Sequence, residues 1–118
     1  MCFRLFAAVR GQPEMGSLEQ LGFRCGLDVR VASQEETRLV EVAWGACACS
    51  LYTRGEGRER VVRFVDALLA QHLTVQLLLL RDEEAAAWAT RAPAEVSAQD
   101  FRARALAALP EGRVAQLC

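Results

Sequence analysis

The sequence predicts a single α+β domain spanning residues 1–118, from its length and from two hydrophobic periodicities. A length of 118 residues with 53% hydrophobic and 25% charged residues is typical of one globular domain. Two segments have apolar residues at helical spacing, Pro13–Leu21 and Gly55–His72. Four segments have the two-residue alternation or the continuous apolar run of a β-strand: Cys2–Val9, Leu27–Val31, Thr37–Trp44 and Thr74–Leu80.

The N-terminal part predicts a strand, a helix and a second strand. Cys2–Val9 is apolar on one face and nearly so on the other, so we expect a central strand. Gly and Pro within Arg10–Pro13 end this strand. Pro13–Leu21 then predicts a short helix that Gly22 closes in the left-handed conformation. Leu27–Val31 alternates apolar and charged residues, which indicates a strand with one solvent-exposed face.

The middle of the chain predicts a hairpin followed by the clearest helix. Ser33–Glu36 is short and polar, so it predicts a turn into the strand Thr37–Trp44. Thr53 and Glu56 resemble a capping box at the start of the helix Gly55–His72. The apolar stripe of that helix consists of Val61, Val62, Val65, Leu68, Leu69 and His72.

The run Thr74–Leu80 is almost entirely apolar, so we expect a strand buried on both faces. The carboxylates of Asp82–Glu84 favour the start of a helix, where they offset the positive end of its dipole, and that helix runs to about Thr90.

The C-terminal part predicts one more helix and a final strand. Ser97 and Asp100 give an N-cap signal for a helix that extends through Leu109. Arg113–Leu117 is expected to form a last strand at the edge of the sheet.

Taken in order, the first six elements are strand, helix, strand, strand, helix, strand. This order predicts a ferredoxin-like βαββαβ arrangement, in which two helices cover one face of a four-stranded antiparallel sheet. The C-terminal helical tail then either covers the other face or lengthens the sheet. The alternative is an open α/β sheet that the tail strand joins.

Composition limits the classes of partner. A net charge of −1 gives no general attraction for nucleic acid or an anionic membrane. The apolar run Val75–Leu80 is too short to span a bilayer, and the N-terminus is more typical of a strand than of a signal peptide. An odd number of cysteines, five, argues for reduced thiols. We therefore expect a cytoplasmic protein.

Strand direction places four cysteines at one end of the predicted sheet. Cys2 begins the first strand, Cys25 precedes the second, and Cys47 and Cys49 follow the third, which runs the opposite way. The acidic run Asp82–Glu84 is expected at the same end. Because thiolates are the preferred ligands of soft metals, the sequence predicts a site for zinc, used for structure or for sensing.

Two other interpretations remain open at this stage. In the first, the cysteines are inert packing residues of a non-enzymatic interaction module, which forms a homodimer through sheet edges or the C-terminal tail or binds another protein. Alternatively, Cys47 and Cys49 form the redox pair of a thiol oxidoreductase, because they precede a helix start with Arg54 and Arg58 nearby. An enzyme is the less favoured class.

Three further sequence features are weaker signals of function. His72 is the single histidine, lies at the other end of the predicted sheet, and is expected to pack at a helix end. Thr53–Arg60 carries two glycines and three arginines but lacks phosphate-loop spacing, so we interpret it as a solvated segment with intrahelical Arg–Glu pairs. Met1-Cys2 with Arg4-Leu5 resembles the N-terminus of class II glutamine amidotransferases, but Phe3 stands where that family has Arg.

Overall fold

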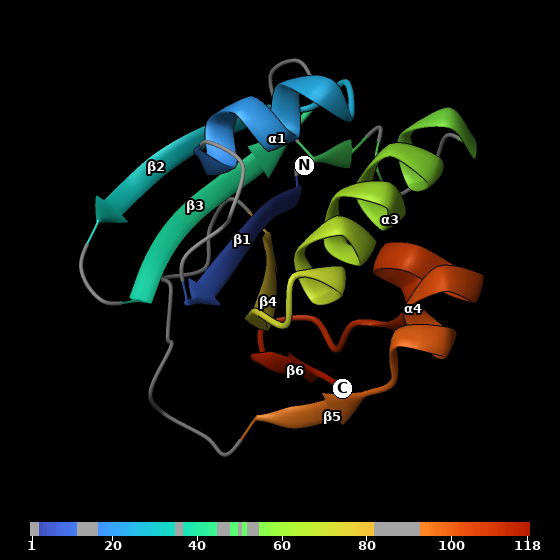
Figure 1. Ribbon diagram of the computed structural model, residues 1–118. Helices are drawn as coiled ribbons and strands as arrows, with labels where there is room; N and C mark the ends of the chain where they lie inside the picture. The colour runs from blue at the N-terminus through green and yellow to red at the C-terminus, as the bar shows by residue number, and fades with distance from the viewer. Residues whose placement is uncertain are drawn as a thin grey trace.

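The computed structural model describes residues 3–11, 17–34, 37–44, 48–49, 51, 55–81 and 93–118. Within these ranges the chain forms an α+β fold with a mixed six-stranded sheet and three α-helices (Figure 1). The predicted helix Asp82–Thr90 and the predicted cap at Thr53 lie outside the described residues.

The strands follow the order β2-β3-β1-β4-β6-β5 across the sheet. Neighbouring strands are antiparallel except β5 and β6, which are parallel. The four predicted strands are present and pair antiparallel, and the tail adds β5 and β6, so the sheet is six-stranded and mixed rather than four-stranded and antiparallel. The bounds are β1 Phe3–Arg10, β2 Asp28–Gln34, β3 Thr37–Ala43, β4 Thr74–Arg81, β5 Ala94–Val96 and β6 Ala115–Leu117.

The C-terminal tail lengthens the sheet beyond β4. Backbone pairing joins Gln76 to Gln116 and Leu77 to Ala115, and the Gln76 side-chain amide donates to Gln116 Oε1 at 2.9 Å. The predicted last strand therefore exists, but β6 lies between β4 and β5 rather than at the edge. The edge strand is β5, which no pattern in the sequence predicts.

Helices α1 (Leu18–Arg24) and α3 (Gly55–Ala70) lie on the same face of the sheet (Figure 1). Helix α4 (Ala98–Arg104) and the 3₁₀ turn η1 (Ala105–Ala108) pack against α3. One hydrophobic cluster joins all of these elements to the sheet. Its members with essentially no exposed surface include Leu5, Val9, Val40, Val61, Phe64, Leu68, Leu77, Phe101 and Leu106.

Strand β1 is central, as its two apolar faces predict. Its odd-numbered residues Leu5, Ala7 and Val9 lie in the helix-side cluster. Phe6, on the opposite face, belongs to a second cluster with Leu78, Leu80 and Val114. The prediction that β4 is buried on both faces is confirmed by the same two clusters.

Helix α1 begins at Leu18 and ends at Arg24, later in the chain than predicted. Ser17 caps it, since Ser17 Oγ accepts from the Gln20 amide at 3.2 Å and Gln20 Oε1 accepts from the Ser17 amide at 3.2 Å. Gly22 lies inside the helix instead of closing it. The left-handed conformation belongs to Gly26, at φ +77°.

Two other helix ends differ from the prediction. Helix α3 ends at Ala70, and His72 is exposed with φ 60°, so its predicted packing role is wrong. Helix α4 ends at Arg104, and Ala105, with φ 50°, starts the η1 turn rather than continuing an α-helix to Leu109.

Candidate functional site at one end of the sheet

Strands β1 and β2 begin, and β3 and β4 end, at the same end of the sheet. The register pairs Phe3 with Arg81, Leu5 with Val42, and Asp28 with Ala43. We call this the cysteine end, because the predicted cysteine ligands flank these strand termini in the sequence. The strand directions on which the site prediction depends are therefore confirmed.

Cys49 lies against the first residue of β1. The Phe3 amide donates a hydrogen bond to Cys49 Sγ at 3.3 Å, and the Ala48 amide donates to the Phe3 carbonyl at 3.1 Å. Ala48 and Leu51 are buried on either side, while Cys49 itself is half-buried. The segment after β3 is thus anchored by apolar side chains, with the thiol held at the backbone of β1.

Cys25 ends helix α1 and is 5% exposed within the main hydrophobic cluster. Its amide donates to the carbonyls of Leu21 and Gly22 at 3.1 and 3.0 Å. Burial raises the pKa of the Cys25 thiol, and the positive charge of Arg63 lowers it by a smaller amount. Because burial is the larger effect, the protonated thiol is the favoured form of Cys25.

Arg60 joins three elements at the cysteine end. Its guanidinium lies over the Trp44 ring, 4.0 Å from the centroid, which is cation–π geometry. It also donates to the Gly26 carbonyl at 2.9 Å and forms an ion pair with Glu56 at 2.6 Å. No sequence motif predicts this contact, because none relates a residue after β3 to a residue in α3.

Two of the four predicted cysteine ligands, Cys2 and Cys47, lie outside the described residues. So does the acidic run Asp82–Glu84. Among the residues that the structure does describe, no group of three or more His, Cys, Asp or Glu side chains is arranged to hold a metal ion. Zinc binding by Cys2, Cys25, Cys47 and Cys49 therefore stays a prediction.

The remaining cysteine and the histidine lie away from this end. Cys118 is exposed after β6, with its Sγ 3.6 Å from the Val96 carbonyl of β5. His72 precedes β4, whose first residue Thr74 pairs with Arg10 at the end of β1. The expectation that His72 lies at the opposite end of the sheet is confirmed.

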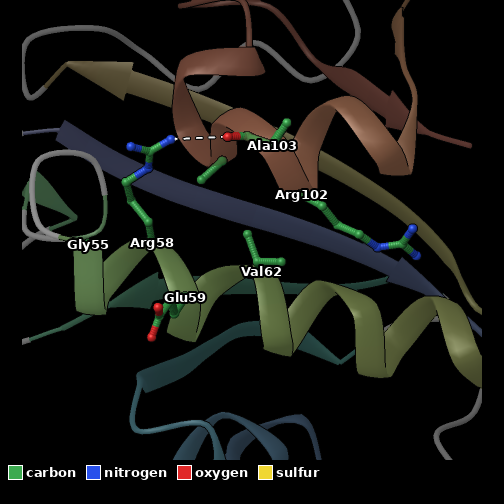
Figure 2. Close-up of a pocket in the computed structure, with 7 residues that line it drawn as sticks. Gly55, Arg58, Glu59, Val62, Arg102 and Ala103 are labelled. Atoms are coloured by element: carbon green, nitrogen blue, oxygen red, sulfur yellow. Dashed lines mark hydrogen bonds between the residues drawn. The ribbon is translucent and has the colours of Figure 1, made fainter.

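A separate hollow of about 270 Å³ lies between α3 and the α4–η1 segment. Figure 2 shows Arg58 at one side, where it donates to the Ala103 carbonyl at 3.3 Å, and Arg102 directed away from the hollow. Arg102 is paired with Asp66 at 2.8 Å. The lining residues are Gly55, Arg58, Glu59, Val62, Arg102, Ala103 and Ala105.

These contacts use both arginines in joining α4 to α3. The expected intrahelical pairing is found between Arg60 and Glu56, four residues apart. The hollow therefore resembles the gap between two packed helices more than a prepared anion site.

Comparison with known proteins gives no assignment: the chain matches no family model, no curated protein and no solved structure at a significant level. None of the helices in the described ranges combines the length and the apolar character needed to cross a bilayer.

Proposed function

We propose that the cysteine end binds a soft metal ion, zinc in the first place, through cysteine thiolates, for structure or for sensing rather than catalysis. The observation that carries this proposal is the hydrogen bond from the Phe3 amide to Cys49 Sγ. The bond holds the sulfur in place at the first residue of β1, and backbone hydrogen bonds of this kind orient the ligands of a metal site.

The two residues that share this bond are each close in sequence to another cysteine. Cys2 immediately precedes Phe3, and Cys47 is two residues before Cys49. Zinc requires sulfurs at about 2.3 Å in a tetrahedral arrangement. A contact between the start of β1 and the Cys47–Cys49 segment supports the proposal that these three thiols share one ion.

Cys25 is the proposed fourth ligand and the least favourable one. Its pKa is raised by burial, so an ion must displace the proton and draw the thiol out of apolar surroundings. The cationic side chain of Arg63 offsets part of the negative charge that a thiolate at Cys25 would carry.

Native mass spectrometry of the purified protein, with and without a chelator, tests the proposal. We expect one zinc ion per chain, lost from Cys49→Ser and retained in Cys118→Ser, a matched control whose thiol lies beside β5. Cobalt substitution provides a second readout, since thiolate-bound Co(II) absorbs strongly in the near ultraviolet. A metal-free mass for the wild-type protein after zinc addition would sink the proposal.

The oxidoreductase interpretation is tested by the same thiols. It requires Cys47 or Cys49 to react rapidly with an alkylating agent near neutral pH in metal-free protein. If Cys47 and Cys49 both react only at the rate of an ordinary exposed thiol, the oxidoreductase interpretation is wrong.

We also propose that the first four strands with α1 and α3 form a ferredoxin-like unit that the tail extends. The order β2-β3-β1-β4, antiparallel throughout, supports this, as does the placement of both helices on one face. Hydrogen exchange tests it: amides of β1–β4 should stay protected when β5 and β6 exchange. Simultaneous exchange of all six strands would argue for one inseparable sheet.

The second candidate function is the interaction module, and the side chain of Phe23 favours it. Phe23 is 82% exposed on α1, two residues before the buried Cys25. Covering this ring with a partner would remove its apolar surface from water, and light scattering after size exclusion tests whether the chain associates with itself.

A further inference from the structure

The guanidinium of Arg60 packs against an aromatic ring and against a glycine. Its central carbon lies 4.0 Å from the centroid of the Trp44 ring. Gly26 approaches the same group so closely that a β-carbon there would lie 2.9 Å from Nη1 and 3.0 Å from Cζ. Hydrogen bonds fix the orientation, because Nη1 donates to the Gly26 carbonyl at 2.9 Å and Nη2 donates to Glu56 at 2.6 Å. The Arg60 side chain is consequently only 25% exposed.

The two residues that Arg60 contacts each lead to a proposed metal ligand. Gly26 follows Cys25 directly, and Trp44 is three residues before Cys47. Arg60 itself belongs to α3, whose buried residues lie in the same hydrophobic cluster as Cys25. Its side chain therefore links the turn that carries Cys25 to the end of β3.

We propose that Arg60 is a positioning residue of the metal site, which holds the Cys25 turn where its thiol and those of the Cys47–Cys49 segment can share one ion. This role rests on the proposed function. Arg60 bonds to the backbone of the turn, so it fixes the position of the turn and leaves the Cys25 side chain free to rotate toward an ion.

The geometry of zinc makes this support necessary. Zinc binds sulfur at about 2.3 Å, so a turn that moves freely carries its thiol out of bonding distance. Removal of groups that orient metal ligands without touching the metal lowers the affinity for the metal about 10–100-fold.

Zinc affinity gives the first test, measured by competition with a chromophoric chelator at a temperature where every variant is folded. Arg60→Ala should weaken zinc binding about tenfold. Arg60→Lys should recover little, because an ammonium group cannot stack flat on the ring and bond to the carbonyl together. Arg58→Ala is the matched control: it removes the same charge from the same helix, but Arg58 contacts the Ala103 carbonyl, so its zinc affinity should equal that of the wild type.

Two results separate positioning from a loss of stability. When Cys25 is already replaced by serine, Arg60→Ala should weaken zinc binding no further, because the ligand that it positions is absent. In cobalt-loaded protein, Arg60→Ala should reduce the thiolate absorption by the share of one sulfur, as Cys25→Ser does.

Alkylation of the metal-free protein tests the contact without zinc. Cys25 is 5% exposed, so an alkylating agent reaches its thiol when the turn opens. Without the Arg60 contact the turn opens more often, and Cys25 should be alkylated several-fold faster in Arg60→Ala than in the wild type. The exposed Cys118 is the internal standard and should react at the same rate in both proteins.

The outcomes distinguish this role from the metal site itself. A wild type that binds no zinc overturns the proposed function, and the role of Arg60 with it. Equal zinc affinity of the wild type and Arg60→Ala overturns the role of Arg60 alone. So does an equal loss of affinity with and without Cys25, since the effect then arises elsewhere. Unchanged alkylation of Cys25 in Arg60→Ala would show that the contact does not hold the turn, which also contradicts the proposal.

Discussion

Replacing Gly22 by alanine tests how closely α1 packs on β2. Gly22 is buried, and a β-carbon there would overlap Val29 Cγ2 and lie 2.9 Å from Val29 Cβ, closer than carbon atoms approach one another. Val29 is β-branched and therefore stiff, and its strand is held by pairing to β3. The helix must consequently move away from the sheet to admit one methyl group.

Two effects of opposite sign decide the magnitude. Alanine favours a helix interior over glycine by about 1 kcal/mol. Overpacking of this kind costs about 1–3 kcal/mol. Because both close atoms belong to the stiff, β-branched side chain of Val29 rather than to a flexible side-chain end, we expect the steric cost to be larger and the free energy of unfolding to fall by about 1–2 kcal/mol. For a chain of this size that lowers the melting temperature by about 4–8 °C.

Gly55→Ala is the control, since the same methyl group there meets nothing within 4 Å. It lies at the first residue of α3, so we expect no loss and a gain of at most about 1 kcal/mol. Urea unfolding followed by circular dichroism measures both. The two substitutions should have opposite signs, and Val29→Ala should relieve part of the cost of Gly22→Ala in the double variant. Equal stability of Gly22→Ala and the wild type would refute the close approach.

Three further predictions concern titration and the Arg60 contact. Burial holds the pKa of the Cys25 thiol above its ordinary value of 9.0, so the unfolded chain loses this proton at a lower pH than the folded chain does. The free energy of unfolding therefore falls as pH rises past that value, by at most about 1.4 kcal/mol per pH unit. Urea titrations over this pH range should show the fall in the wild type and its absence in Cys25→Ala. The Arg4 guanidinium donates hydrogen bonds of 2.9 and 3.1 Å to Glu41 and lowers the pKa of that carboxyl. The ion pair therefore stabilises the fold above pH 4.5, and this stabilisation is lost as pH falls through the lowered pKa. Arg4→Gln should reduce the acid-dependent loss of stability by less than about 1 kcal/mol, since both side chains are partly exposed. Arg60→Ala should lower stability by about 1–2 kcal/mol in thermal unfolding, and Arg60→Lys should recover little, because an ammonium group cannot stack flat on Trp44 and bond to a carbonyl as the guanidinium does.

The spacing of apolar residues along the sequence predicts the long strands and the long helix, because seven or more residues are enough to show which face of an element is buried. It failed where tertiary contacts decide. Strand β5 is three residues long, too short for a periodicity, and exists through its pairing with β6. Gly22 was assigned to a helix end on conformational grounds, whereas the folded chain uses it for close packing on Val29. The Ser17–Gln20 capping box was present in the sequence and would have placed the start of α1 correctly.

At the candidate site too, features set by local sequence are predictable and those set by tertiary contacts are not. Strand direction alone predicted which termini share an end of the sheet, and the register confirms it. The burial of Cys25 was not predictable, since it depends on how near α1 lies to β2. The stacking of Arg60 on Trp44 joins residues sixteen positions apart in the sequence, and neither residue type signals its partner.

The packing of α1 and the chemistry of Cys25 are linked through the same turn. The Gly22 carbonyl accepts from the amides of both Cys25 and Leu27, at 3.0 and 2.8 Å, so the close contact at Gly22 also fixes the thiol inside the core. If Cys25 completes a zinc site, the ion removes its proton and the alkaline loss of stability should vanish when zinc is bound. If Cys25 only packs, that loss should be the same with and without zinc, and Cys25→Ser should retain the metal. The pH dependence of unfolding therefore decides between three and four thiolates at the cysteine end.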